Sequence, residues 1–151
     1  MLKTMTFFVD HRPIAKQSFR MGKFGGYQPK RVTDFKKHAQ LVARHAAKKH
    51  GWAKDDGPLM ITFVFQFRCP KSASKADKLL VRWNTKRPDL DNIEKSITDA
   101  LDDLMSDDSQ VCYKISKKII AKHGDVEGIT VTISQLPKYP EQIEEESNEP
   151  V

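Results

Sequence analysis

The chain has 151 residues, of which 38% are hydrophobic, enough for one hydrophobic core but too few residues for two ordinary domains. No window approaches the roughly 18 to 20 apolar residues of a membrane-spanning helix, and the N-terminus lacks the pattern of a secretory signal. The two cysteines, Cys69 and Cys112, have neither zinc-ligand spacing nor the density of a disulfide scaffold. We therefore expect a cytoplasmic protein with no membrane association.

Charge is distributed unevenly along the sequence, although the net charge is +6. Residues 1–88 carry 20 basic and 5 acidic side chains, whereas residues 89–108 carry 1 basic and 8 acidic side chains. A large basic field around one acidic segment suits a polyanionic partner, because Lys and Arg neutralise phosphates and release counterions. This layout favours a nucleic-acid-binding protein over a protein whose basic surface only keeps it soluble.

The first third of the chain predicts a strand, a basic loop and a long helix. The apolar run MTFFV predicts a strand over residues 5–9. Residues 14–31 mix cations with aromatic residues, glycines and a proline, which indicates a loop or an irregular hairpin. From Thr33, the expected N-cap, apolar residues recur at helical spacing up to Gly51. Candidates for contacts with a nucleic-acid backbone, with solubility as the alternative, are Lys16, Arg20, Lys23, Lys30 and Arg31.

The middle of the chain predicts a central strand and an amphipathic helix. Residues 59–67 are β-branched and aromatic, as in a largely buried strand. The polar, basic run 70–86 reads as a connection that contains a short helix. The clearest helix spans residues 92 to about 103, with Asp91 as its N-cap and Glu94 completing a capping-box pattern.

The last third predicts two strands and a tail. Residues 111–122 and 129–136 have strand composition, and the turn between them favours an antiparallel pair. The acidic residues 138–151 are expected to form a disordered tail. We therefore predict a single α/β (α+β) domain over residues 1–137, with a mixed sheet of about four strands and two main helices in the order β-α-β-α-β-β.

Carboxylates flank the predicted helix 92–103. Asp89 and Asp91 precede it, Asp108 follows it, and Lys95 stands one turn after Asp91. Mg²⁺ prefers carboxylate oxygens and water, and next to a phosphate it can polarise the phosphoryl group and activate a water. Lys95 could stabilise negative charge on the phosphate. Each residue alone also fits a helix cap, a solvated turn or an i, i+4 ion pair.

In order and spacing, these residues resemble the signature of RusA-type Holliday-junction resolvases. The segment RPDLDNIEKSITDALDDLMSDDSQV, residues 87–111, contains an Asp-Leu-Asp-Asn element and a downstream Asp-Asp-x-Gln-Val element on either side of a helix with a lysine. The resemblance implies a site in which Asp89, Asp91 and Asp108 hold Mg²⁺, or Mn²⁺ in its place, and Lys95 assists. It also implies a homodimer that cuts four-way DNA junctions and is encoded by a bacterium or a prophage.

The N-terminal part of the resemblance is weaker. Phage-encoded relatives often have a glycine shortly before a Pro-x-x-Lys element, and this chain has Pro13 and Lys16 but His11 and Arg12 in the region of the glycine. The conformation of the first loop is therefore left open.

Helix length sets a condition on the acidic residues. A helix from residue 92 to 104 is about 20 Å long, whereas the four residues that lead to Asp108 span only about 13 Å. We expect the helix to stop near Leu101 so that the chain doubles back. The alternative is that the carboxylates meet by another path, such as across a subunit interface.

Other functions stay open or are disfavoured. A nuclease for flaps or forks would share the same metal site, and a non-catalytic branched-DNA-binding protein would need no metal. The chain has no Walker A motif and no GxGxxG, so no nucleotide cofactor is expected. Its five histidines form no zinc-type pattern, and we assign them no chemistry.

Overall fold

The structure is a computed structural model that describes residues 1–16 and 20–143. Its elements are β1 (Thr4–Val9), β2 (Arg20–Gly22), β3 (Gly25–Tyr27), α1 (Lys30–His50), β4 (Leu59–Phe67), α2 (Lys75–Lys78), β5 (Arg82–Trp83), α3 (Leu90–Thr98), the 3₁₀ helices η1 (Asp99–Leu104) and η2 (Asp108–Gln110), β6 (Val111–Ile120) and β7 (Gly128–Gln135). The predicted α/β (α+β) class is confirmed. Within the described residues, no helix combines the length and the apolar composition needed to cross a membrane.

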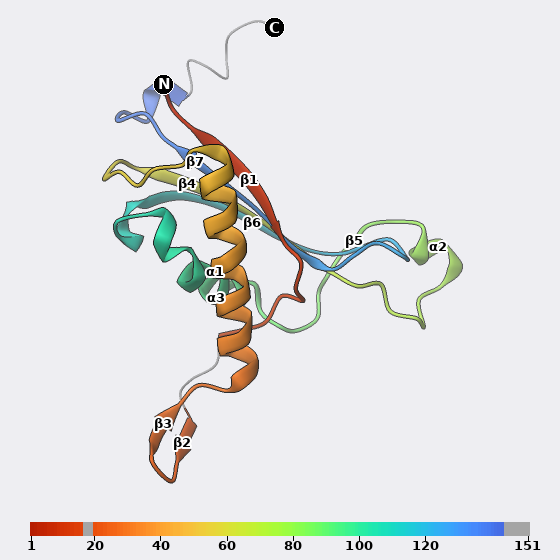
Figure 1. Cartoon of the computed structure of the whole chain (residues 1–151). Coiled ribbons are helices and arrows are strands. Elements are labelled where there is room, and N and C mark those ends of the chain that lie inside the picture. Colours follow the sequence, from red (N-terminus) through yellow and green to blue (C-terminus); the bar gives the residue numbers. More distant parts are fainter. Residues whose placement is uncertain (17–19, 144–151) are drawn as a thin grey trace, which may run out of the picture.

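A mixed sheet with strand order β1-β7-β4-β6-β5 forms one layer of the fold, and helices α1 and α3 pack on one of its faces (Figure 1). β4 lies in the centre, as predicted, antiparallel to β7 and parallel to β6. The predicted antiparallel pairing of the last two strands is wrong, because β4 separates β6 from β7. The connection through α3 returns the chain parallel to β4, so β6 and β7 take opposite edges of the central strand.

The core forms between the sheet and α1. Alternate residues of β4 from Leu59 to Phe67 are buried, while the residues between them face the other side. The buried stripe of α1 includes Phe35 and small alanines, which let the helix lie close to the sheet. This helix begins at Lys30 with Pro29 as its N-cap, so the prediction that Thr33 caps it is wrong. The Thr33 hydroxyl instead donates to the carbonyl of Lys30, one turn earlier, which is a bond made inside the helix.

Helix α3 starts and ends earlier than predicted. Its N-cap is Asp89, which makes no side-chain capping bond, and Asp91 lies in the first turn, so the predicted capping box of Asp91 and Glu94 is wrong. The α-helical hydrogen bonding ends at Thr98, three residues before the expected stop. The chain then tightens into η1 and becomes extended at Met105. Aspartates in η1 are unfavourable at the negative end of a helix dipole, which explains the early end.

The basic segment before α1 contains a β-hairpin. Strands β2 and β3 pair antiparallel and project away from the main sheet at the N-terminal end of α1 (Figure 1). At the other end of the chain, residues 138–143 form a bend and a helical turn. The rest of the predicted acidic tail, residues 144–151, lies outside the described residues.

Candidate active site

One face of α3 carries most of the residues predicted for catalysis. Asp91 and Lys95 are exposed neighbours on this face, with 3.9 Å between Oδ2 and Nζ. The face borders a cavity of about 270 Å³, and Asp108 reaches the same cavity from η2. Because α3 ends early, the chain doubles back and Asp108 lines the same cavity as Asp91. The cavity is lined by Asp91, Glu94, Lys95, Thr98, Asp99, Asp108 and Lys114.

Asp89 lies just before this face and lines a separate hollow. That hollow also contains Arg87, Pro88 and Asn92 and has a volume of about 430 Å³. Among the described residues, no three Asp, Glu, His or Cys side chains are gathered closely enough to enclose a metal ion. Thus the structure places Asp91, Lys95 and Asp108 around one cavity and Asp89 in a separate hollow.

The turn that carries Asp108 is held by its two neighbours in the sequence. Asp107 caps η2, because its carboxylate accepts a 2.8 Å hydrogen bond from the N–H of Ser109. Hydrogen bonding by Ser109, through its side chain first and its N–H second, lowers the pKa of Asp107. Gln110 is buried, and its Oε1 accepts hydrogen bonds from the N–H groups of Ser106 and Asp107. Of the two adjacent aspartates, Asp107 is thus structural, and Asp108 is left to face the cavity.

The amide nitrogen of Gln110 anchors the same turn to the rest of the protein. Its Nε2 donates to the carbonyls of Asp55 and Gly57, at 2.8 Å each, in the segment that leads into β4. The amide thus joins the η2 turn to the central strand. This contact fixes where Asp108 stands relative to the sheet.

Lysines neutralise part of the negative charge of the site. Lys114 on β6 lies 3.3 Å from Glu94, whose side chain is only 17% exposed. Lys16, from the loop after β1, lies 2.9 Å from Asp99. Each of these pairs links α3 or η1 to another element, so the cavity is bordered by alternating charges.

Negative charge also accumulates in η1, where Asp102 lies near Asp108 but outside the lining of the cavity. Burial raises the pKa of Asp102, and the nearby charge of Asp108 raises it further. A group that binds here and carries positive charge would relieve this repulsion.

Four residues of the cavity were missed by sequence reasoning: Glu94, Thr98, Asp99 and Lys114. A signal existed for Glu94, because positions 91, 94, 95 and 98 share one helix face. Asp99 continues that face, but this could be predicted only if the end of the helix were known. Lys114 had no signal, since its place depends on the register of β6 against β4, where it pairs with Ile61.

The candidate DNA contacts are spread over the N-terminal hairpin and its flanks. Lys23 lies in the turn between β2 and β3, and Lys30 and Arg31 open α1; all three are exposed. Lys16 is committed to the pair with Asp99, and the side chain of Arg20 lies outside the described residues. Of these cations, Lys23 is presented by the hairpin and Lys30 and Arg31 by the first turn of α1, and none of the three lines the acidic cavity.

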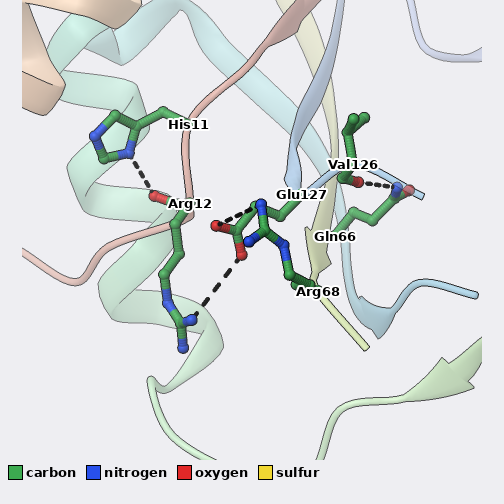
Figure 2. A network of polar contacts seen from close by, with 6 residues as sticks. All are labelled: His11, Arg12, Gln66, Arg68, Val126 and Glu127. Carbon is green, nitrogen blue, oxygen red and sulfur yellow. Dashed lines mark hydrogen bonds and ion pairs between the residues drawn. The ribbon is translucent and has the colours of Figure 1, made fainter. Parts of the chain in front are cut away.

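Arg12, one of the two residues in the region where the resemblance led us to expect a glycine, takes part in a network of its own. Figure 2 shows Arg12 and Arg68 on either side of Glu127, each with a nitrogen 4.0 Å from a carboxylate oxygen. The Arg12 guanidinium also lies 5.6 Å from the centre of the Phe67 ring. The Nδ1 atom of His11 lies 2.8 Å from the carbonyl oxygen of Arg12. Side-chain contacts therefore order this loop without glycine.

Comparison with known proteins agrees with this geometry. A family model described as Endodeoxyribonuclease RusA matches residues 10–134, which include α3, η2 and the strands β4 and β6. The chain is 28% identical over 127 residues to a crossover junction endodeoxyribonuclease rusA of Lactococcus phage r1t, covering 80% of this chain and 91% of that protein. It is 36% identical over 124 residues to the uncharacterized protein YqaN of Bacillus subtilis strain 168, covering 74% of this chain and 84% of that protein. The chain belongs to the RusA endodeoxyribonuclease family.

Proposed function

We propose that this protein is a Mg²⁺-dependent endonuclease that resolves four-way DNA junctions by cutting two opposed phosphodiesters. The observation that carries the proposal is the cavity in which Asp91, Lys95 and Asp108 meet, in a chain of the RusA family. The name of the phage relative, a crossover junction endodeoxyribonuclease, supports the same substrate.

The donor atoms around the cavity fit a hard divalent cation. Asp91 and Asp108 are exposed carboxylates on one cavity, and Asp89, just before α3, lines a separate hollow. Mg²⁺ keeps several of its waters and needs only one or two protein carboxylates, so an open set of oxygens suffices. We propose that these three aspartates hold Mg²⁺, with Mn²⁺ as a substitute. When bound, the ion supplies Lewis acidity at the phosphate and an activated water.

The lysines of the site act on the substrate. In the proposal, Lys95 points its ammonium towards the scissile phosphate and stabilises the charge that grows on its oxygens. Its pairing with Asp91 at 3.9 Å is exposed and weak, so it can be exchanged for a phosphate contact. Lys114 remains paired with Glu94 and holds that carboxylate in place.

A homodimer suits the proposed substrate. A four-way junction has two-fold symmetry and its resolution needs two incisions, which two identical sites related by a two-fold axis can deliver. Exposed cations at Lys23, Lys30 and Arg31 are our candidates for holding the DNA backbone of each arm. The setting that we propose is the cytoplasm of a bacterium, with the gene in its genome or in a prophage.

The test is the cutting of a synthetic four-way junction, with linear duplex and flap DNA alongside. The wild type, Asp91→Asn and the control Asp125→Asn, which lies in the β6–β7 turn, are compared in Mg²⁺ and in chelator. We expect paired, Mg²⁺-dependent cuts from the wild type and the control, and a loss of at least about 100-fold in rate for Asp91→Asn. Equal cutting of flaps would indicate another branched-DNA nuclease. Tight junction binding without cuts would make the protein a binding module.

A further inference from the structure

A lysine outside the cavity holds the segment that leads into it. The Nζ of Lys118, on β6, donates to the carbonyl of Lys86 at 2.5 Å and to the carbonyl of Pro88 at 2.7 Å. The backbone carbonyl of Lys118 accepts a 3.0 Å hydrogen bond from the N–H of Asn84. One residue therefore contacts the segment 84–88 at three points, and the last of them in the sequence belongs to the peptide that precedes Asp89.

The strand register explains why this side chain reaches the segment. Lys118 pairs with Phe65 of β4, whose side chain is buried on the face of the sheet that the helices cover. Lys117 pairs with Val64 and points to the opposite face, where it lines a hollow with Trp83. Because side chains alternate along a strand, only Lys118 is directed at the segment before α3.

The contacts of Lys118 are strong for a surface segment. A hydrogen bond with a charged donor is about twice as strong as one between neutral groups, and here two carbonyls share one half-buried ammonium. Within the segment, Asn84 Oδ1 accepts a hydrogen bond from the N–H of Lys86. This single bond between neutral groups orders the segment less than the contacts of Lys118 do. Removing the ammonium would leave the carbonyls of residues 86 and 88 without this donor.

We propose that Lys118 is a positioning residue for the metal site: by fixing the peptides before Asp89, it sets the place of that carboxylate and of the first turn of α3. Lys118 does not touch the substrate, and its effect passes through the backbone of residues 86–89. The part of this inference that concerns metal binding rests on the proposed function, whereas the ordering of residues 86–89 by Lys118 does not. Partners of this kind, one step removed from metal ligands, typically change metal affinity 10- to 100-fold.

The test compares Lys118→Met, which keeps the length of the side chain without its charge or donors, with Lys117→Met as the matched control. Hydrogen exchange of the amides in residues 84–90 reports the order of the segment directly, without any activity. We expect exchange about 10-fold faster or more in Lys118→Met and unchanged in Lys117→Met. Lys118→Arg, which keeps a cationic donor, should stay closer to the wild type.

Metal titrations of junction cutting give the second readout. We expect Lys118→Met to need about 10-fold more Mg²⁺ or Mn²⁺ for half-maximal rate, with the rate at saturating metal within a few fold of the wild type. Junction affinity in chelator should be unchanged. Unaltered exchange, equal effects of the two Met variants, or unfolding of both Lys118 variants would each overturn the positioning role. A wild type that neither cuts DNA nor binds Mn²⁺ would instead overturn the proposed function, whatever the exchange shows.

Discussion

Two adjacent aspartates in the DDSQV segment have different tasks. Asp107 is bound to the N–H of Ser109 and caps η2, whereas Asp108 faces the cavity. The buried amide of Gln110 supports both, because it makes two hydrogen bonds within this turn and two to the segment before β4. The geometry of the site thus depends on a residue that cannot itself bind metal in this position.

Replacing Gln110 by Ala should therefore impair stability and activity together. Four backbone groups lose a hydrogen bond, of which only the carbonyl of Asp55 keeps another, from the Ser106 hydroxyl, and we expect a loss of about 3 kcal/mol in the free energy of unfolding. At temperatures where the variant stays folded, the cutting rate should still fall about 10-fold, because Asp108 is less well placed. Urea unfolding and junction cutting measure the two effects. Gln40→Ala, at a half-buried position on α1, is the control. Wild-type stability of Gln110→Ala would contradict the anchoring role.

The contact between His38 and Asp10 makes the stability of the protein slightly dependent on pH. His38 Nε2 lies 2.7 Å from Asp10 Oδ1, and this hydrogen bond lowers the pKa of Asp10. A carboxyl with a lowered pKa in the folded state adds stability above its unfolded pKa of about 3.9, and the gain is lost as the pH falls through the folded value. Because Asp10 is 71% exposed, Asp10→Asn should cost less than about 1 kcal/mol at pH 6, and less again at pH 3. Urea midpoints at the two pH values, with Asp56→Asn as control, test this; a cost that grows towards pH 3 would refute it.

Among the elements, α1 depends on the glycine that ends it. Gly51 closes the helix in the left-handed region, with φ of 63°, and the N–H of Trp52 donates to the carbonyl of Ala47 at 2.9 Å. A Cβ added at Gly51 would meet no atom within 4 Å, so the cost of Gly51→Ala is purely conformational and should be about 1 kcal/mol. Gly57→Ala, at a glycine without positive φ, should cost clearly less. Thermal unfolding of both variants measures these costs. Equal losses of stability would show that the left-handed conformation of Gly51 is not the cause of the destabilisation.

The elements also show where sequence reasoning works. Strand β4 and the C-terminal end of α1 were predicted at their observed residues, because a hydrophobic run bounded by turn residues and a glycine after a helix are local signals. The start of α3 was predicted two residues late, because Asp91 satisfies the composition of an N-cap as well as Asp89 does. The end of α3 could be predicted only roughly, because the unfavourable effect of the aspartates after Thr98 had to be weighed against the apolar stripe that continues beyond it.

At the scale of the whole molecule, pairing between distant strands was the least predictable feature. The parallel contact of β4 with β6 places Lys114 in the cavity and Lys118 against the segment before Asp89. The sequence alone does not distinguish Lys114 and Lys118 from the exposed Lys117, which lies between them on the same strand. The three predicted residues that share the cavity came from a motif within 25 residues, whereas the supporting lysines come from β6 and depend on its register.

The charge layout predicts how DNA binding responds to metal. In the proposed function a DNA phosphate lies at the cavity lined by Asp91 and Asp108, and without a cation these two carboxylates should repel it. Removing one negative charge about 6 Å from a phosphate in a water-like medium makes the free energy of DNA binding more favourable by about 0.7 kcal/mol, which is about threefold in affinity.

We therefore expect Asp91→Asn and Asp108→Asn each to bind a four-way junction about threefold more tightly than the wild type in chelator. The difference should shrink or reverse when Ca²⁺ or Mg²⁺ is added, because only the wild type gains a bound cation. Fluorescence anisotropy of a labelled junction at several salt concentrations measures both effects, since all the affinities fall with salt. Asp125→Asn removes the same charge from the β6–β7 turn and should change the affinity less. Weaker metal-free binding by the two site variants would mean that these carboxylates contact DNA favourably, which a bare phosphate-facing aspartate cannot do.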